Sequence, residues 1–447
     1  MSFARILGRR EVIALAFGAM VGWSWIFLTG TWVLRAGTIG AIAAFVIAGI
    51  VMVLIALTYA ELAAAMPSVG GEHVYTERAF GRAISFVCTW SLLLGYVSIV
   101  AFEAVAFPEA LSYLFPQLSV GKLWQIAGSD IYLSHVVIGI GTGALITAIN
   151  VRGLVGAARL QTIVTTFILI AGIFLILGTI LQFDVANLEP QFSGSIIGIG
   201  AVIVMLPLMF LGFDVIPQAA EEINLPPEKI GILIVVSLVI AVSFYTAMVA
   251  AVGFGLPGAL RATSNLTTAD TAARVWEGEW AAKIIVVGGL AGIVTSWNAF
   301  LVGSSRLMYA LAKDQMLPRS LAVLHPRRST PHYILWLIFA VSAVAPWFGR
   351  PVLVWLIDAG SLGVIIAYGV VAACFLKLRS AEPDMPRPYR VPYGRTVGIL
   401  ALVSSAGIGL LYLPWSPNAL VWPQEWLIFG GWAMMGLLMF NAAKRAS

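Results

Sequence analysis

The amino-acid sequence predicts an all-α polytopic membrane protein with twelve transmembrane helices. Hydrophobic residues make up 60% of the chain and charged residues only 11%. The mean hydropathy of +0.96 lies far above the range of soluble globular domains. Long apolar runs such as residues 45–60, FVIAGIVMVLIALTYA, do not alternate in polarity. Because strands of a membrane barrel alternate, these runs predict helices, and each helix needs roughly 20 apolar residues to cross the bilayer.

Twelve apolar runs follow one another along the chain, separated by polar segments. The longest polar segments are too short to form a core of their own, so residues 1–447 are expected to form one transmembrane domain. The first run follows basic residues but has no small-residue cleavage site, and we expect it to be retained as the first helix. Cys88 and Cys374 lie inside apolar runs, which indicates neither a disulfide framework nor a metal site. We expect the helices to begin near residues 12, 39, 83, 133, 158, 196, 230, 281, 333, 352, 397 and 425.

The distribution of basic residues predicts the orientation of these helices. Twelve spans place both termini on the same side of the membrane. Of the 26 lysines and arginines, 20 fall in the termini and in the loops expected on the side of the termini, and six fall on the other side. Because basic residues are enriched in cytoplasmic loops, the sequence predicts a multi-pass protein of the cell inner or plasma membrane with both termini in the cytoplasm. The net charge of +5 is explained by this bias and indicates no nucleic-acid partner.

Glycines interrupt two of the expected helices at corresponding places. The first helix contains GAMVGWSWIF, residues 18–27, and the sixth contains PLMFLGFDVIPQAAEE, residues 207–222. A single such glycine is often a packing device, but matched breaks in two halves of a chain indicate the binding site of an inverted-repeat transporter. Broken helix ends expose N–H and C=O groups that suit a carboxylate and a cation.

Four further segments, in this order, carry a family resemblance. They are YAELAAAMPSVGGEHVYTERAFG (59–81), INVRGLVGAARLQTIVTTFIL (149–169), GFDVIPQAAEEINLP (212–226) and SSRLMYALAKDQMLPRSLAVLHPRRSTPH (304–332). Together with the broken first helix, the chain resembles permeases of the amino acid, polyamine and organocation (APC) superfamily. The resemblance implies a LeuT-type fold, with inverted repeats over about 12–182 and 196–377 and two further helices over 397–443. It also implies secondary active transport of an amino acid or a related amine by alternating access, and we expect an amino acid carried by a symporter or exchanger.

The resemblance places the substrate at the two helix breaks. The family's first break reads roughly Gly-Ser-Gly-Ile-Phe, whereas here Gly22 is kept and two indoles, Trp23 and Trp25, flank a serine. An indole narrows the pocket, stacks on the substrate or contacts an ammonium group; the alternative is packing against neighbouring helices. In the sixth helix we expect Phe213 to shield the substrate and Asp214 to accept N–H bonds from the unwound backbone. The residues expected at the substrate site are Ala19, Met20, Gly22, Trp23, Ser24, Trp25, Ile26, Phe210, Gly212, Phe213, Asp214 and Trp297.

The coupling ion is left open. Glu103 lies deep in an apolar run, where an acid is costly and therefore indicates function by default; it suits a proton, a substrate amine or a structural hydrogen bond. Thr295 and Ser296 offer hydroxyls of the kind that bind sodium in some relatives, although their own helix backbone often satisfies such groups. Ile168 stands where many relatives carry a lysine in the fifth helix. Sodium, a proton on Glu103 or Asp214, and uncoupled exchange all remain, and no cofactor is expected.

Further expectations concern the gates of the transport pathway and the alternative functions. We expect gates at Phe213 and Asp358, and inner salt bridges from Glu221 and Glu222 to cytoplasmic basic loops. The alternative function is an amine or polyamine permease, which the indoles and the Glu103 carboxylate favour. A membrane sensor is disfavoured because no soluble output domain is present, and an enzyme because the spans hold no catalytic constellation. The expected partners are a small substrate and the lipid bilayer, without an obligatory protein.

Overall fold

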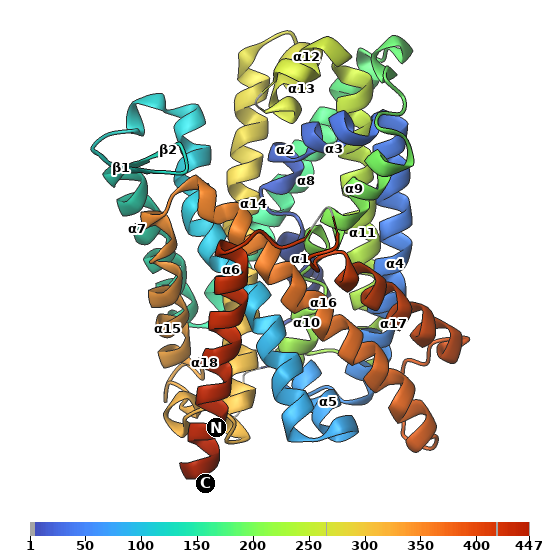
Figure 1. Cartoon of the computed structure of the whole chain (residues 1–447), viewed down its shortest axis with the longest axis vertical. Coiled ribbons are helices and arrows are strands. Elements are labelled where there is room, and N and C mark those ends of the chain that lie inside the picture. The colour runs from blue at the N-terminus through green and yellow to red at the C-terminus, as the bar shows by residue number, and fades with distance from the viewer. Residues whose placement is uncertain (1–4, 265, 417–418, 447) are drawn as a thin grey trace.

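The structure, a computed structural model, describes residues 5–264, 266–416 and 419–446. Figure 1 shows an almost entirely helical molecule. In chain order the longer helices are α1 (Arg9–Met20), α4 (Thr38–Ala65), α6 (Arg82–Leu114), α7 (Leu133–Arg152), α8 (Leu154–Leu181), α9 (Ser195–Met209), α11 (Pro227–Gly255), α14 (Glu279–Lys313), α15 (His332–Ser342), α16 (Arg350–Ala381), α17 (Gly394–Leu410) and α18 (Gln424–Ala446). Shorter helices are α2 (Ser24–Phe27), α3 (Thr29–Ala36), α5 (Glu72–Phe80), α10 (Val215–Gln218), α12 (Gly258–Thr263) and α13 (Thr267–Val275). Single 3₁₀ turns lie at Pro116–Leu118, Val185–Leu188, Ala220–Glu222, Arg319–Ala322 and Ala345–Trp347.

A helix begins within four residues of each of the twelve expected starts. Within the described residues, eight helices are long and apolar enough to cross a membrane: α4, α6, α7, α8, α11, α14, α16 and α18. The apolar helices α9, α15 and α17 are shorter. The prediction of a polytopic helical membrane protein is therefore confirmed at this level, and the count of twelve spans stays a prediction.

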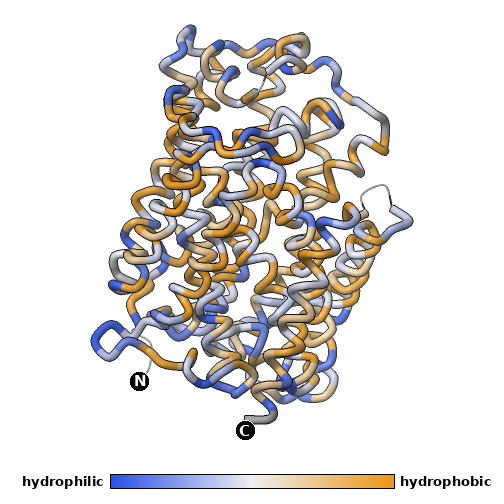
Figure 2. Tube along the Cα trace, turned by 60° about the vertical axis from the view of Figure 1, so that its left-hand side comes forward, coloured by the Kyte–Doolittle hydropathy of each residue, from blue (hydrophilic) through white to orange (hydrophobic). Residues whose placement is uncertain are grey.

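The outer surface of the helical bundle is apolar over much of its height. On α8, Ile163, Ile170 and Leu177 are 63%, 57% and 51% exposed, and their spacing of seven residues puts them on one face of the helix. Figure 2 shows hydrophobic residues through the middle of the molecule and hydrophilic ones toward its two ends. A soluble monomer rarely exposes apolar surface on this scale, so this surface is suited to lipid.

Three helices form the centre of the bundle. In α6, α14 and α16, 72% of the most apolar stretch is buried inside the molecule, whereas in α18 only 11% is buried. Figure 1 accordingly shows α18 at the periphery. Of the central helices, α14 packs against α1 and α16 packs against α9. The sequence predicts α1 and α9 to be the broken helices.

The two ends of the molecule differ. Figure 1 marks both chain ends at the end where α5 lies, here called the terminal face. The opposite end, here called the hairpin face, carries α12, α13 and an antiparallel pair of strands, β1 (Lys122–Ile126) and β2 (Ser129–Tyr132). The turn residues Ala127 and Gly128 both have positive φ, 45° and 82°, as a type I′ hairpin turn requires. These strands were not predicted from the sequence, because they are short and lie in a polar loop.

Candidate functional site

The first helix is broken between Met20 and Ser24. Its cut end is held by Tyr245 of α11, whose hydroxyl donates to the Met20 carbonyl over 2.8 Å and lies 2.6 Å from the Ser24 hydroxyl. Beyond the break, the first backbone hydrogen bond is the one that the Ile26 N–H donates to the Trp23 carbonyl over 3.1 Å. The N–H groups of residues 22–25 therefore lack the i−4 carbonyl of a continuous helix. Tyr245 was not predicted from the sequence, because its only signal is a tyrosine inside an apolar run.

The second break separates α9 from α10 and lies directly against the first. Gly212 has φ +133°, a conformation that favours glycine. Its N–H donates to Asp214 Oδ1 over 2.8 Å, which is the kind of bond expected for Asp214. A Cβ on Gly212 would lie 2.5 Å from Ala19 Cβ and 3.0 Å from Met20 N. The two breaks thus meet where only a glycine fits, and the sequence-predicted pairing of the two segments is seen in space.

Glu103 of α6 lies beside the first break. Its side chain is 2% exposed. A Cβ on Gly22 would lie 3.3 Å from Glu103 Oε1 and 3.4 Å from Ser296 Oγ of α14, so these three residues meet at one point. Within the described part of the chain, Glu103 Oε2 has no hydrogen-bond partner. A buried carboxylate oxygen without a partner is costly and is suited to a proton or to a cationic group of a ligand.

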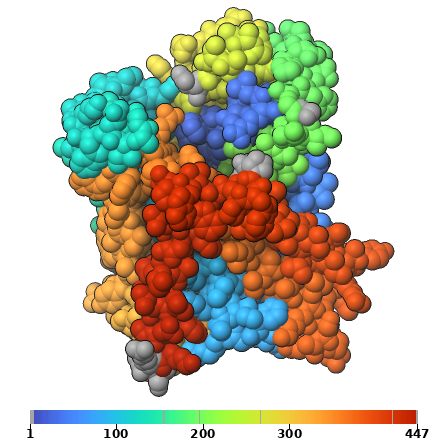
Figure 3. Space-filling model, in the orientation of Figure 1, coloured from blue at the N-terminus to red at the C-terminus, as the bar shows by residue number. Residues whose placement is uncertain are grey.

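A cavity of about 360 Å³ leads from the hairpin side toward this point. Trp23 lines it, together with Phe102, Glu109, Tyr113 and Arg350, whose guanidinium lies 5.6 Å from the centre of the Phe27 ring. In Figure 3 the blue surface of the N-terminal segment is visible in a recess between the cyan hairpin segment and the red C-terminal segment. The two indoles therefore differ in position. The buried Trp25 packs edge-on against Phe244, 5.5 Å between ring centres, and only Trp23 lines this cavity.

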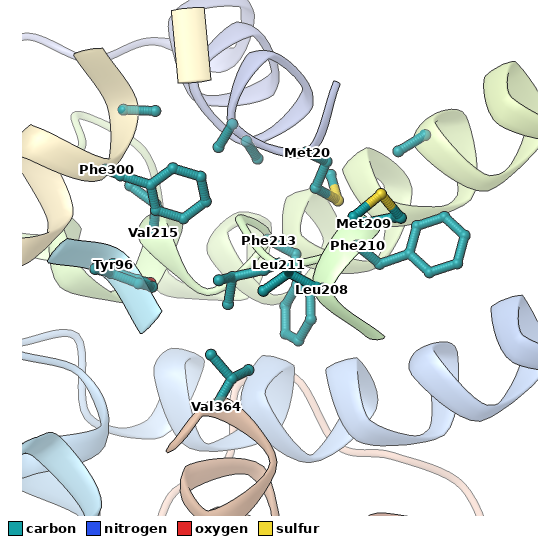
Figure 4. Close-up of a cluster of buried hydrophobic side chains, with 14 of the residues drawn as sticks. Met20, Tyr96, Leu208, Met209, Phe210, Leu211, Phe213, Val215, Phe300 and Val364 are labelled. Carbon is teal, nitrogen blue, oxygen red and sulfur yellow. The ribbon is translucent and has the colours of Figure 1, made fainter. Parts of the chain in front are cut away.

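Aromatic rings fill the region around the second break. Phe213 lies between Tyr59 and Tyr368, with ring centres 5.4 Å and 5.6 Å away. Figure 4 shows Phe213 pointing toward Val364 of α16, whereas Phe210 points away from it. Phe210 packs against Phe45 of α4, 6.1 Å between ring centres. Phe213 is fully buried, and its shielding role stays a prediction.

One polar side chain of α14 forms a hydrogen bond within its own helix, and another forms hydrogen bonds to neighbouring helices. Thr295 donates to the Gly292 carbonyl of its own helix over 2.9 Å, the outcome weighed against sodium binding. Asn298 donates to Gln161 of α8, and Asn150 of α7 donates to Asn298, each over 2.8 Å. These bonds tie three helices together. Sequence reasoning did not identify Asn150, because its partner lies 148 residues away.

Other residues singled out in the sequence lie against different neighbours. Trp297 packs toward α7: a Cβ on Gly143 would lie 2.8 Å from its Cζ2 atom. Asp358 interacts with Glu425 of α18 and is absent from the lining of the 360 Å³ cavity. Ile26 is fully buried and contacts Gly289 of α14. Ile168 of α8 is also fully buried. The structure thus brings together the two breaks, Glu103 and Ser296. The Trp297 ring and the Asp358 side chain make other contacts.

Polar contacts link several chain segments at the terminal face. Glu222 forms an ion pair with Arg306 over 2.8 Å, and both side chains are no more than 2% exposed. The Glu222 carbonyl also accepts the N–H groups of Ile6 and Leu7, each over 2.9 Å. Its neighbour Glu221 accepts the N–H of Val69 instead. These contacts join the chain before α1 to the ends of α10 and α14, and their role as a gate stays a prediction.

Two buried acids, Glu72 and Asp214, lie toward the terminal face. The Gln218 amide donates to the carboxylate of Glu72, the first residue of α5. Asp214 lies one helical turn before Gln218 and shares its face. In the described residues Glu72 Oε1 and Asp214 Oδ2 have no hydrogen-bond partner. Burial, and next the charge of Asp214, raise the pKa of Glu72 well above its usual range. Glu72 was not predicted from the sequence, because it stands in an expected loop.

Comparison with known proteins gives consistent results along nearly the whole chain. A family model described as amino acid permease matches residues 7–440. The chain is 28% identical over 455 residues to the methylthioribose transporter of Bacillus subtilis (strain 168), which covers 99% of this chain and 94% of that protein. It is 26% identical to the branched-chain amino acid permease of the same organism, with the same coverage. It is also 26% identical to the aspartate-proton symporter of that organism, over 91% of this chain and 79% of that protein. These relatives are transporters rather than enzymes.

Proposed function

Because this chain belongs to the amino acid permease family, we propose that it is a secondary active transporter that carries an amino acid across the cell membrane by alternating access. The observation that carries the proposal is the meeting of two broken helices, at Gly212 and Ala19, beside an outer cavity. Twelve spans with two inverted repeats and cytoplasmic termini complete the proposal, supported by both chain ends lying at the terminal face and by the bias of basic residues.

In this proposal the substrate enters from the hairpin face. The 360 Å³ cavity above Trp23 is the entry route, and the Glu222–Arg306 pair closes the exit at the terminal face. The described conformation is then the outward-facing one. Opening toward the cytoplasm requires that this ion pair and the bonds of Ile6 and Leu7 to Glu222 break. The free energy that these contacts contribute to the outward-facing conformation sets its population relative to the inward-facing one.

The breaks offer complementary groups to an amino acid. The amides around Gly22 to Ser24 suit its carboxylate, and the unpaired oxygen of Glu103 suits its ammonium group. Glu103 also favours the second candidate, an amine permease, because an amine needs the carboxylate but not the amides. One relative is named for methylthioribose, which has neither group, so that compound belongs in the same test.

We propose a proton as the coupling ion. Ile168 leaves the fifth helix without a cation at the position where many relatives have lysine. Three buried acids, Glu72, Glu103 and Asp214, each have an oxygen without a partner in the described residues, and such an oxygen is suited to take up a proton. Thr295, bonded to its own helix, gives sodium less support.

A thermal-shift screen of the purified protein tests the substrate class. The ligands are L-leucine, L-aspartate, L-arginine, isoamylamine, agmatine and methylthioribose, because a ligand that binds the native state raises the melting temperature. A shift with L-leucine but not isoamylamine, or with L-arginine but not agmatine, supports the amino acid proposal. A shift with the amines alone supports the second candidate. A shift with methylthioribose alone contradicts both.

Uptake into proteoliposomes then tests the coupling ion. An inward proton gradient is expected to drive accumulation of the ligand found in the screen, and a sodium gradient is not. Accumulation that follows sodium and ignores the proton gradient would contradict the proton proposal. Uptake that depends on neither gradient would also contradict proton coupling and would indicate an uncoupled exchanger.

A further inference from the structure

Four arginines line a cavity at the terminal face that the transport proposal does not use. The cavity has a volume of about 480 Å³ and lies between the end of α16 and the beginning of α17. Its lining contains Arg379, Arg387, Arg390 and Arg395 beside the apolar Leu376 and Ile399. A neighbouring cavity of about 470 Å³ shares three of these arginines. These four arginines are here called the arginine pocket.

Two of the arginines are fixed by one carboxylate. Glu61 of α4, 1% exposed, lies 2.8 Å from Arg379 Nε and 3.1 Å from Arg387 Nε. It also accepts the N–H of Val391 over 2.7 Å. The Arg387 guanidinium donates in addition to the Met385 carbonyl over 2.9 Å. These bonds hold the two guanidinium groups in place, but Glu61 supplies only one negative charge for two positive ones.

The other two arginines carry charge that the described protein does not neutralise. Arg390 and Arg395 are exposed, and they take part in none of the ion pairs found in the described part of the chain. The nearby Glu382 pairs with Arg78 instead, 2.5 Å. The pocket thus combines four positive charges with one negative charge. Planar guanidinium groups bind phosphate oxygens in pairs of parallel hydrogen bonds, so the pocket is suited to a phosphate group.

The apolar neighbours of the pocket indicate the rest of the occupant. Ile399 lines the pocket and is 45% exposed, and Val403, one turn further along α17, is 62% exposed. Tyr393 borders the neighbouring cavity and is 87% exposed. Tyrosines are typical of the membrane interface, and exposed aliphatic side chains on a spanning helix contact acyl chains. A phosphate beside such a surface fits a lipid better than a soluble anion.

We propose that the arginine pocket binds the phosphate headgroup of an anionic phospholipid in the leaflet that borders the terminal face, with its acyl chains along Ile399 and Val403. Arg379 and Arg387 provide the fixed part of the site. Arg390 and Arg395 provide the free charges. The site is separate from the helix breaks, so the inference does not depend on which substrate the protein carries.

Lipid binding to the purified full-length protein in neutral detergent tests this inference. The probes are dioleoyl-phosphatidylglycerol, dioleoyl-phosphatidylcholine and inorganic phosphate, read out by native mass spectrometry and by the melting temperature. The test variant is R390Q/R395Q, which removes the two exposed arginines and leaves the Glu61 pairs intact. The matched control is R327Q/R328Q, which removes the same charge from exposed positions in another loop of the terminal face.

The native protein and the control are expected to retain phosphatidylglycerol and to melt at a higher temperature with it. The R390Q/R395Q variant is expected to bind it about 30-fold more weakly, at roughly fivefold per arginine. Equal losses in the two double variants would overturn the inference, because they would indicate unspecific charge attraction. Equal binding of phosphatidylcholine, or a full shift with inorganic phosphate alone, would also overturn it. Should R390Q/R395Q melt lower than the native protein without lipid, the single variant R395Q, expected to lose about fivefold, takes its place.

Discussion

The ion pair between Glu222 and Arg306 is expected to hold the terminal face closed, and E222Q is the perturbation that tests it. Glutamine keeps the shape of the side chain but leaves the Arg306 guanidinium buried without its carboxylate. Both side chains are no more than 2% exposed, so the cost is that of breaking a buried pair, about 3–5 kcal/mol. At about 1.4 kcal/mol per tenfold, opening of the terminal face is expected to become roughly 100- to 4,000-fold more frequent.

Hydrogen–deuterium exchange measures this opening directly. The Leu7 N–H donates to the Glu222 carbonyl and the Asn224 N–H donates to the Leu7 carbonyl, each over 2.9 Å. These amides exchange only when the contact between the two segments opens. In E222Q both are expected to exchange faster by the factor above, while central segments of α6 and α14 keep their native rates. The double variant E222Q/R306M is expected to regain protection, because the guanidinium charge is removed together with the carboxylate that it pairs with.

The control is R78Q, which breaks the pair between Arg78 and Glu382. These side chains are 46% and 33% exposed, and exposed pairs contribute little, so exchange at Leu7 and Asn224 is expected to stay at the native rate. Native protection of Leu7 and Asn224 in E222Q would refute the reasoning. Faster exchange throughout the helices of E222Q would refute it as well, because the pair would then stabilise the whole fold rather than one conformation.

Three further predictions concern the site. E103Q is expected to weaken binding of ammonium-bearing ligands at least about tenfold, because a charge-assisted hydrogen bond is lost; an unchanged thermal-shift titration would exclude contact between Glu103 and the ligand. Y245F is expected to destabilise the protein by about 1–3 kcal/mol, because the Met20 carbonyl loses its donor; chemical unfolding beside the exposed control Y333F measures this, and equal stabilities would contradict it. The raised pKa of Glu72 means that the folded state holds the proton more tightly than the unfolded state, so this residue lowers stability as pH rises above 4.5. The melting temperature of E72Q, relative to the native protein, is therefore expected to increase with pH, and a pH-independent difference would contradict it.

The helices and their breaks were predictable because the bilayer constrains them strongly. A span needs roughly 20 apolar residues, which is why each of the twelve starts could be read from hydropathy to within four residues. The breaks were predictable because Gly22 and Gly212 stand in apolar runs that otherwise favour a continuous helix. The hairpin β1–β2 and the short helix α5 were not predictable, since a few residues in a polar loop carry no periodic signal.

The contacts of the site were predictable only in part. Glu103 stands out as an acid in an apolar run, but its proximity to Gly22 and Ser296 depends on how three helices pack. Trp23 and Trp25 are two residues apart and therefore lie on opposite sides of a helical turn, and the sequence does not reveal which one faces the cavity. Pairs such as Glu61 and Arg379 are separated by 318 residues, beyond the reach of any local pattern.

The most direct test of transport is counterflow in proteoliposomes that contain the purified protein. The vesicles are loaded with the unlabelled ligand identified by the thermal-shift screen and diluted into a trace of the same ligand with a radioactive label. A transporter that alternates access around the two helix breaks is expected to accumulate the label transiently above its outside concentration, and protein-free vesicles are not. Binding of the ligand without accumulation of the label would contradict the proposal and would indicate a membrane protein that binds without transporting.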